Sequence, residues 1–543
     1  MTGLEIPGIC YVIGGTKPEG QSRRVGTHRP ALYRLKLLGH SELPKAHNMR
    51  EQKDLSHNTK PEPDLSPALA LTPIIFLIAL LGCSVYLFGA DSSAGANQVA
   101  LMLASCVAAL VGRKVGVSWS ESQQGMIHGI SLGLGPILIL LSVGMLIGTW
   151  ILCGTVPAMI YYGVQIINPS IFYAASAALC AVIAISIGSS WTVAGTLGVG
   201  LMGIAGSFAL SPTITAGAII SGAYFGDKLS PMSDTTNLAA AATGVDLFDH
   251  IRHMLWTTIP AFALALLIFA LIGSSNAAAP GEIRTLQQSL TAQFNIGLHL
   301  LLPLGLMLAL VYKRFPAYPA IIISALAGAV FAVLFQPEAV VRLAGGLPGG
   351  GFFDLVKGIW ISLFDGYTSD SDNAFLDALL SKGGMSSMLN TVWLIICALA
   401  FGGVLERTGI LNYVLQWTLR RVKSDGSLIT ATVCTCIGTN ALAADQYIAI
   451  ALPGRMYADT YERHGLSRLN LARTLEDSAT LTSALIPWNT CGAYMSATLG
   501  VATLQYAPFA FFNLLCPIIA IVYGFTGFAL KPTAPPIVKA DTV

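Results

Sequence analysis

Long uncharged apolar runs alternate with short polar segments along most of this chain. A run of about 20 apolar residues forms a helix that crosses a bilayer, whereas the strands of a membrane barrel are shorter and alternate. The pattern therefore predicts an all-α polytopic membrane protein with about 10 crossings. The runs are 68–89, 97–112, 131–152, 170–188, 191–210, 213–225, 254–273, 296–312, 317–336, 388–405, 427–453, 474–503 and 505–528.

Composition excludes the soluble classes of protein. Of the 543 residues, 54% are hydrophobic and 11% are charged, whereas soluble domains carry about 25% charged residues. Soluble enzymes, nucleic-acid binders and secreted disulfide scaffolds are thereby excluded. The net charge of +2 indicates no acidic or basic partner. We expect the lipid bilayer and small transported solutes as partners, and no cofactor.

The first 64 residues differ from the rest. They hold 10 of the 30 Lys and Arg and no apolar run long enough for a signal peptide or a span. We expect residues 1–64 to form a disordered cytoplasmic tail. Translation from Met49 is an alternative, which would leave residues 1–48 outside the protein.

Basic residues indicate the topology. Lys and Arg gather in cytoplasmic loops of membrane proteins, which places both termini inside. The loops expected inside contain Arg113, Lys114, Lys313, Arg314, Arg420, Arg421, Lys423, Arg455, Arg463, Arg468 and Arg473. The loops expected outside are 90–96, 154–169 and 337–387, which are poor in Lys and Arg.

One segment does not fit a simple span. Arg420 and Arg455 are both expected inside. The stretch between them is apolar and long enough to enter the membrane, but it is too short to cross it twice. A re-entrant hairpin over 427–453, turning near Gly438-Thr439-Asn440, satisfies both constraints. Non-helical backbone at membrane depth lines a cavity or is covered by protein, so the hairpin points to a site.

The chain contains an internal repeat. Ile187-Gly188-Ser189-Ser190 resembles Ile437-Gly438-Thr439-Asn440, and Asp227 precedes Asp477 by the same 250 positions, as Ser230 precedes Thr480 and Ser233 precedes Ser483. Run 131–152 is expected to leave the cytoplasm and run 388–405 to return, which predicts an inverted repeat, as in many secondary transporters. The expected parts are a first repeat 65–275, a connection 276–387, a second repeat 388–530 and a cytoplasmic tail 531–543.

Two broken transmembrane helices complete the predicted architecture, together with a first hairpin over 170–210. Pro231 interrupts the first, within Gly226–Asn237, and Pro487 follows the second, within Glu476–Thr490. An acidic residue inside a membrane is a functional candidate. The cation- and proton-binding candidates are Asp227, Asp234, Asp477, Asp445 and Glu476, and the supporting ligands are Ser189, Ser190, Ser230, Ser233, Thr235, Thr236, Asn237, Thr439, Asn440, Thr480, Asn489 and Thr490.

A carboxyl group that holds either a proton or a cation, but not both, is the requirement for antiport. Each candidate also has a purely structural interpretation, which the sequence leaves open. In these interpretations Asp227 pairs with Lys228, Asp234 caps a helix, Glu476 pairs with Arg473, Asp445 pairs with Arg455, and the hydroxyls of Ser189, Ser190 and Thr439 and the amide of Asn440 bond the hairpin backbone.

Four strings, GDKLSPMSDTTNLA, DLFDHIRHMLWTT, DQYIAIALPGRMY and RTLEDSATLTSALIPWNTCG, resemble the NhaC-type Na⁺/H⁺ antiporter family of the ion-transporter superfamily. The resemblance covers about residues 66–530 and lies in both halves. It departs from the family pattern at Ala240-Ala241, where a proline is expected. It implies inverted repeats with two hairpins and two broken helices.

The resemblance also implies exchange of Na⁺, with Li⁺ as a second cation, for H⁺ across the bacterial inner membrane, in pH homeostasis. The alternative is exchange or symport of a small organic acid, such as malate and lactate, or of an amino acid. Lys228 is the only basic residue in the broken segments, and a carboxylate substrate needs more, so a cation is favoured. The sequence does not give the oligomeric state, and a homodimer is one option.

Overall fold

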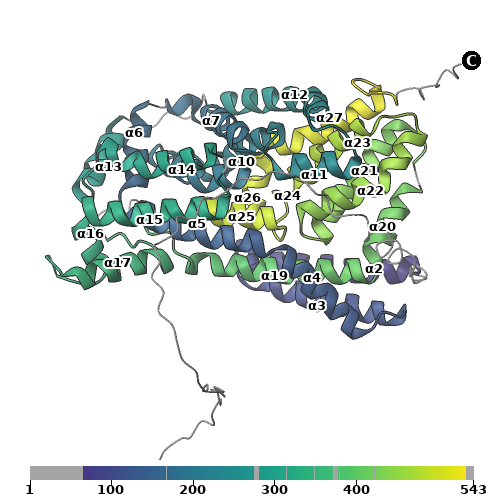
Figure 1. Cartoon of the computed structure of the whole chain (residues 1–543), viewed down its shortest axis with the longest axis horizontal. Coiled ribbons are helices and arrows are strands. Elements are labelled where there is room, and N and C mark those ends of the chain that lie inside the picture. Colours follow the sequence, from purple (N-terminus) through teal and green to yellow (C-terminus); the bar gives the residue numbers. More distant parts are fainter. Residues whose placement is uncertain are drawn as a thin grey trace, which may run out of the picture. The chain divides into compact units, whose positions relative to one another are not determined.

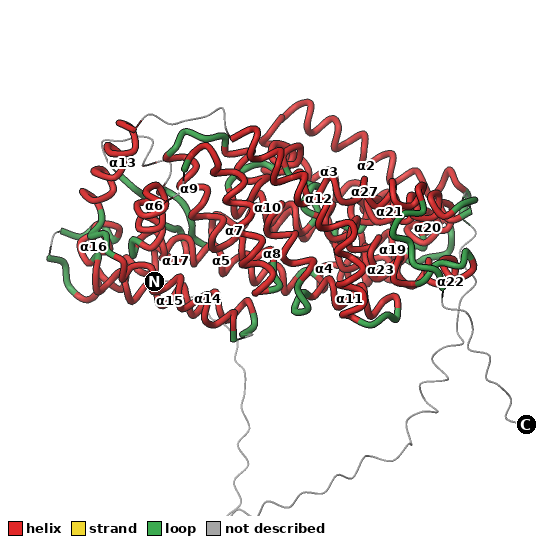
Figure 2. The backbone as a smooth tube through the Cα atoms, turned by 90° about the horizontal axis from the view of Figure 1, so that it is seen from above, coloured by secondary structure: helices red, strands yellow, loops and turns green. Residues whose placement is uncertain are grey.

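The computed structural model describes residues 65–533 apart from 167, 274–279, 314, 348, 371–376, 378–379 and 421. The predicted tail 1–64 and most of the tail 531–543 lie outside these residues. Helices and loops make up the described part, which contains no β-strand (Figure 2). Seven helices are long and apolar enough to cross a membrane, or up to nine if each of two bent pairs is one span. The prediction of an all-α polytopic membrane protein is confirmed.

The helices follow one another as shown in Figure 1. In the first half of the chain they are α2 (Pro67–Phe88), α3 (Ala96–Lys114), α4 (Trp119–Leu132), α5 (Leu134–Leu152), α6 (Thr155–Ile166), α7 (Phe172–Ile187), α8 (Ser190–Val193), α9 (Val199–Ser207), α10 (Pro212–Leu229), α11 (Asp234–Thr243) and α12 (Leu247–Gly273). A connecting group follows with α13 (Pro280–Gln293), α14 (Leu302–Tyr312), α15 (Ala317–Phe335), α16 (Pro337–Leu343) and α17 (Phe352–Phe364). The remainder are α19 (Leu389–Arg407), α20 (Ile410–Leu419), α21 (Asp425–Leu442), α22 (Gln446–Arg463), α23 (Arg468–Leu475), α24 (Leu481–Ser483), α25 (Thr490–Leu499), α26 (Thr503–Tyr506) and α27 (Phe511–Thr526).

Two segments expected as outer loops contain helices. Loop 154–169 contains α6, and loop 337–387 contains α16 and α17. In α6 the side chains of Val156, Ile160 and Val164 are buried. Their spacing of four residues places them on one helix face, so a helix too short to span packs against the core.

The first hairpin and the first broken helix divide where the sequence predicts. α7 ends at Ile187, Gly188 adopts a left-handed backbone with φ of 72°, and Ser189 caps α8. α10 ends at Leu229 and α11 begins at Asp234, with Pro231 in the gap. Glycine adopts this φ without steric cost, which explains the break at position 188.

The second hairpin turns five residues later than predicted. Gly438, Thr439 and Asn440 lie inside α21, and the break spans 443–445. The hydroxyl of Thr439 donates to the carbonyl of Thr435 at 2.8 Å, a bond that is compatible with a continuing helix. Asp445 ends the turn, because its side chain accepts hydrogen bonds from the first N–H groups of α22.

The second broken helix also differs from the prediction. Residues Glu476–Thr480 form a π-helical turn, η6, that joins α23 to α24 without a gap, and the break lies at 484–489. Pro487 therefore interrupts the helix beyond Ser483, and the predicted ligands of 476–483 project from a helix rather than from a loop.

Backbone features recur at a spacing of 256 rather than the predicted 250. Ser189 and Asp445 cap α8 and α22, and Ser233 and Asn489 cap α11 and α25. The left-handed Gly244 and Gly500 end α11 and α25, which have ten residues each. The spacing of 250 is therefore wrong, and so is the pairing of Asp227 with Asp477. The inverted orientation of the halves stays a prediction.

Glycines bring α7 and α10 into close contact. A Cβ on Gly222 would lie 2.1 Å from the carbonyl oxygen of Ala177, and one on Gly226 would lie 2.4 Å from that of Ala181. Small residues allow such backbone approach between membrane helices. This packing holds the end of α10, with Asp227, against the break after α7.

Candidate functional site

Asp227 lies at the wall of a cavity of about 730 Å³. The backbone N–H and the hydroxyl of Ser190 donate to its Oδ2 at 3.0 and 2.6 Å. Asp227 is 7% exposed, so water in the cavity reaches it only partly. The N-terminus of α8 points at this carboxylate, and a helix N-terminus stabilises negative charge. The sequence-based alternative in which Asp227 pairs with Lys228 is wrong.

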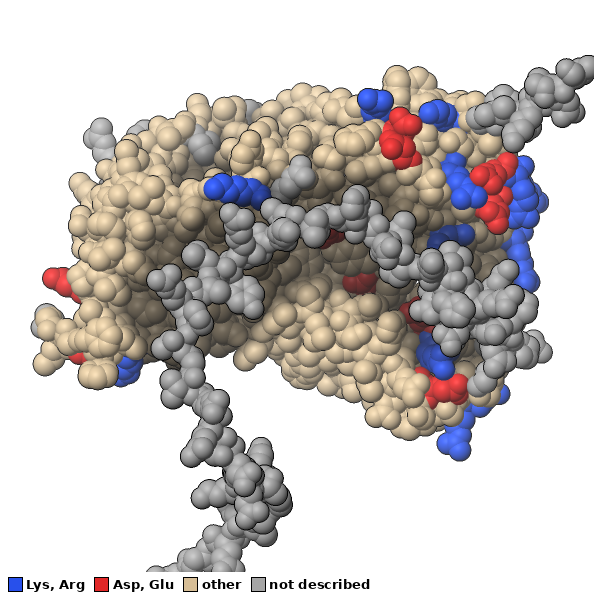
Figure 3. Space-filling model, in the orientation of Figure 1, with Lys and Arg blue, Asp and Glu red and all other residues tan. Residues whose placement is uncertain are grey.

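The cavity is bordered by both halves of the chain. Its polar lining residues are Ser189, Thr192, Asp227, Ser233, Asp234, Thr235 and Gln446, and Tyr318 and Tyr447 also line it. Asp234 is exposed and occupies the first position of α11, which Ser233 rather than Asp234 caps. Carboxylate and hydroxyl oxygens are hard ligands that suit a small cation. The face in Figure 3 is hollowed in its middle, with acidic side chains visible at depth.

Lys228 turns away from the cavity and pairs with Asp477. Its ammonium contacts Oδ1 of Asp477, and both side chains are fully buried. Thr257 of α12 donates to the same oxygen at 2.9 Å, and the thiol of Cys516 in α27 lies 3.2 Å from it. A buried ion pair is compensated when further hydrogen bonds satisfy its polar atoms. Thr257 and Cys516 do this for Oδ1 of Asp477, whereas its Oδ2 has no hydrogen-bond partner among the described residues.

Asp477 has a second cationic neighbour. Nε of Arg473, one helical turn earlier, lies 4.0 Å from its Oδ2, and Nη1 of Arg473 donates to the carbonyl of Ala529 at 2.8 Å. Glu476 is fully buried, and neither of its carboxyl oxygens has a hydrogen-bond partner among the described residues. The alternative in which Glu476 pairs with Arg473 is therefore wrong.

Asp445 is a helix cap with one unused oxygen. Its Oδ1 accepts from the N–H groups of Tyr447 and Ile448 at 2.9 and 3.0 Å, and its Oδ2 has no hydrogen-bond partner in the described part of the chain. Arg455 instead donates to the carbonyl of Ala451 at 3.3 Å. The alternative in which Asp445 pairs with Arg455 is wrong, and Asp445 stays a candidate beside the cavity-lining Gln446 and Tyr447.

Asn440 and Asn489 join the two breaks of the second half. Asn440 donates to the carbonyl of Ala479 at 2.6 Å, and Asn489 donates to the carbonyl of Asn440 at 3.1 Å. The backbone N–H of Thr490 donates to the carbonyl of Ala444 at 3.0 Å. These residues hold the hairpin turn against the broken helix, so they build the site without lining the cavity.

The other supporting candidates mostly bond locally. Ser189 accepts a hydrogen bond from the N–H of Thr192, and Ser230 accepts one from the N–H of Met232. The hydroxyls of Ser233 and Thr235 lie 3.0 Å apart. Thr236 donates to the carbonyl of Lys228 at 3.0 Å, and Asn237 donates to the carbonyls of Pro231 and Ser233. The hydroxyl of Thr480 is buried and has no partner within the residues described. Of the predicted set, Asp227, Asp234, Ser189, Ser233 and Thr235 meet at one cavity.

Two side-chain contacts, one in each half of the chain, are related by the spacing of 256 positions. Ser190 donates to Asp227, and the matching pair is Gln446 with Ser483, whose hydroxyl donates to Oε1 of Gln446 at 3.4 Å. The two halves thus place similar contacts between hairpin and broken helix, but a carboxylate stands in the first half and a hydroxyl in the second. The two halves are therefore not equivalent in charge.

Sequence reasoning missed Thr257 and Cys516 as partners of Asp477, and Gln446, Tyr447 and Trp191 as cavity residues. Thr257 and Cys516 lie within apolar runs, where a hydroxyl or thiol often bonds only its own helix. Gln446 follows Asp445 directly, and the position of the hairpin turn is the signal that could have found it.

Comparison with known proteins shows the family to which the chain belongs. Residues 222–528 match the Na⁺/H⁺ antiporter family. The chain is 38% identical to the Na⁺/H⁺ antiporter NhaC of Alkalihalophilus pseudofirmus over 80% of this chain and 91% of that protein. It is 36% identical to the malate-2H⁺/Na⁺-lactate antiporter of Bacillus subtilis, over 82% and 92%, and 34% identical to the arginine/ornithine antiporter ArcD of Halobacterium salinarum, over 89% and 97%. The chain belongs to the Na⁺/H⁺ antiporter family.

Proposed function

We propose that this protein exchanges Na⁺ for H⁺ across the membrane, with Asp227 as the carboxylate that holds one ion or the other. Family membership and the similarity to NhaC support the proposal. The observation that carries it is the position of Asp227, which borders a cavity while its neighbour Lys228 is engaged elsewhere. A carboxylate that is free of a cationic partner is open to Na⁺ or to a proton.

The surroundings of Asp227 suit this exchange. Ser190 holds Oδ2 with two hydrogen bonds, which fixes the carboxylate without neutralising its charge. The hydroxyls of Ser189 and Ser233 line the same cavity and offer further oxygen ligands. A proton on the carboxyl removes the charge that binds Na⁺. The two ions therefore exclude each other, and one site loaded alternately from the two sides produces antiport.

A cation fits the cavity better than an organic acid does. Two Asp side chains line it, and none of the described lining residues is Lys or Arg. Lys228 cannot serve a carboxylate substrate while Asp477 binds it. The malate–lactate relative therefore does not change the assignment.

Asp477 takes a different role from the one the sequence suggested. Lys228 neutralises it and Arg473 lies close by, so Asp477 serves as an internal counter-ion rather than as a Na⁺ ligand. Li⁺ is the second cation expected at Asp227, because it also prefers hard oxygen ligands.

The protein spans the bacterial cytoplasmic membrane with both termini inside. Charged side chains support this orientation. They gather at the right of Figure 3, where Figure 1 places α20, α22 and α23, and most of the remaining face is uncharged. Basic residues concentrate on the cytoplasmic side of membrane proteins.

The test is proton movement in everted vesicles that contain the full chain and a pH-sensitive dye. After respiration has acidified the vesicles, Na⁺ and Li⁺ should each restore dye fluorescence, and K⁺ or malate should not. Vesicles without the protein are the control. Recovery with malate and none with Na⁺ would overturn the proposal in favour of organic-acid exchange.

A further inference from the structure

Two segments of the chain border the Asp227 cavity at one end and a second cavity at the other. In α5, Pro136 and Ile139 line the first cavity, and Ile147 and Ile151 line the second. Along α8 and α9, Trp191 and Thr192 line the first, and Val199 and Met202 line the second. The two cavities therefore lie at successive levels of the same packed elements.

The second cavity has about 480 Å³ and a polar rim. Asp365, Thr368, Ser381, Lys382 and Ser387 line it. Ser381, Lys382 and Ser387 are exposed, so this cavity opens at the protein surface.

A closed layer separates the cavities. It consists of Val143 in α5, Ala194–Gly198 in the π-helical turn η3, and Tyr494 in α25, and we refer to these residues as the central layer. Val143 and Tyr494 are at most 1% exposed, and all five residues of η3 are buried. Val199 lies seven positions after Thr192, which at the rise of a helix gives a layer about 10 Å thick.

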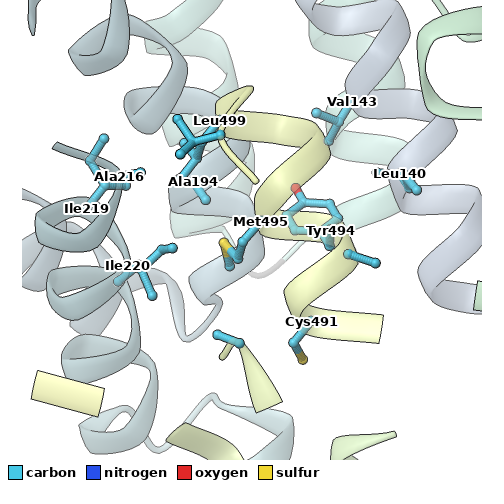
Figure 4. Close-up of a cluster of buried hydrophobic side chains, with 14 of the residues drawn as sticks. Leu140, Val143, Ala194, Ala216, Ile219, Ile220, Cys491, Tyr494, Met495 and Leu499 are labelled. Carbon is cyan, nitrogen blue, oxygen red and sulfur yellow. The ribbon is translucent and has the colours of Figure 1, made fainter. Parts of the chain in front are cut away.

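Tyr494 closes the layer from the second half of the chain. Its ring stacks on Trp191 with the centroids 4.1 Å apart, and its hydroxyl donates to the carbonyl of Trp191 at 2.8 Å. A Cβ on Gly195 would lie 2.8 Å from that hydroxyl and 3.2 Å from Val143. Figure 4 shows Tyr494 between the helix that carries Leu140 and Val143 and the segment that carries Ala194.

The central layer is buried and close-packed, which makes it a barrier to ions. An ion loses its hydration in an apolar layer at a cost far above thermal energy. Residues of both halves meet there, because η3 belongs to the first half and α25 to the second. A π-helical turn within a helix often marks a functional site, and here it lies between the two cavities.

We propose that the central layer is the closed gate of the transport path, and that the cavity lined by Asp365 and Lys382 is the vestibule on the side of the membrane opposite Asp227. This inference rests on the proposed transport of a cation. Trp191 lines the Asp227 cavity and also stacks on Tyr494, so the gate adjoins the cation site directly. Opening the path requires α25 to part from α8 and η3.

The first test is the access of an impermeant, positively charged thiol reagent to single introduced cysteines. Ile139→Cys, Met202→Cys and Ala194→Cys are compared with the parent chain in sealed vesicles of both orientations. Reagent from one side should label position 139 and not 202, reagent from the other side should label 202 and not 139, and position 194 should react much more slowly than either, because it is reached only while the gate is open. Labelling of 139 and 202 from the same side, or of 194 as fast as either, overturns the inference.

This readout does not depend on which ion is carried. If Na⁺ and Li⁺ fail to move protons while the labelling pattern holds, the proposed function fails and the gate stands. If exchange occurs and both positions are labelled from one side, the gate fails and the function stands.

A second test measures leakage through a damaged gate. Tyr494→Ala in proteoliposomes should let Na⁺ flow down its gradient without the opposite movement of H⁺, and Tyr494→Phe, which keeps the stacked ring, should not. Tyr461→Ala is the matched control, because Tyr461 is equally buried and packs in a separate cluster. The proposal is contradicted if a correctly inserted Tyr494→Ala variant still couples each Na⁺ movement to H⁺ movement as tightly as the Tyr461→Ala variant does.

Discussion

The ammonium of Lys228 and the carboxylate of Asp477 form a fully buried ion pair that joins two segments 249 residues apart. Lys228 ends α10, and Asp477 lies in the π-helical turn η6. Lys228 directly follows Asp227 in the sequence, but neither Lys228 nor Asp477 lines the cavity that Asp227 borders. The two carboxylates therefore have different roles. Asp477 neutralises the charge of Lys228, whereas Asp227 is open to a cation from solution.

Breaking this pair should destabilise the protein strongly. Lys228→Met and Asp477→Leu each leave one buried charge without its main partner, at an expected cost of about 3–5 kcal/mol. The double variant removes both charges and should lose less than either single variant. Melting temperatures of the purified proteins in detergent measure this. Additive losses in the double variant would show that the two side chains do not interact.

A pair of glycine substitutions tests where the hairpins turn. Gly438 lies inside α21 with nothing within 4 Å of an added Cβ, so Gly438→Ala should stabilise the protein by about 0.5–1 kcal/mol. Gly188 has φ of 72°, and an added Cβ would lie 2.8 Å from the backbone of Met232. Gly188→Ala should therefore lower the melting temperature. A loss of stability in Gly438→Ala would instead support a hairpin turn at Gly438, as the sequence suggested.

Cysteine labelling tests the inverted orientation of the halves. Tyr162→Cys, in α6, should react with an impermeant reagent from outside the cell, and Ser424→Cys, before α21, only from inside. Each follows the corresponding long helix of its half, α5 or α19, and basic residues flank only the second position. Labelling of both from the same face would make the duplication parallel.

The spans could be predicted from the sequence because burial in lipid requires apolar runs of fixed length. The run 131–152 corresponds to α5 and the run 388–405 to α19. The first break was equally readable, because Gly188 and Pro231 each interrupt a helix for local reasons.

The position of the second hairpin turn and the partners of Asp477 could not be predicted from the local sequence. Gly438-Thr439-Asn440 has the composition of a turn, but Asn440 instead donates to Ala479, 39 residues away. Lys228 finds Asp477 through the packing of α10 against α27 and η6. Such long-range contacts follow from tertiary packing, on which local sequence carries no information. The equal spacing of Asp227 and Asp477 was for this reason mistaken for equivalence.

The release of protons on Na⁺ binding tests the central claim most directly. Adding Na⁺ to the purified protein in weakly buffered detergent should release protons, because Na⁺ displaces the proton from Asp227. Asp249→Asn, at an exposed position paired with Arg252, should release them as the parent chain does, and Asp227→Asn should release none. Parent-like release from a folded Asp227→Asn variant would contradict the assignment of the exchange site to Asp227.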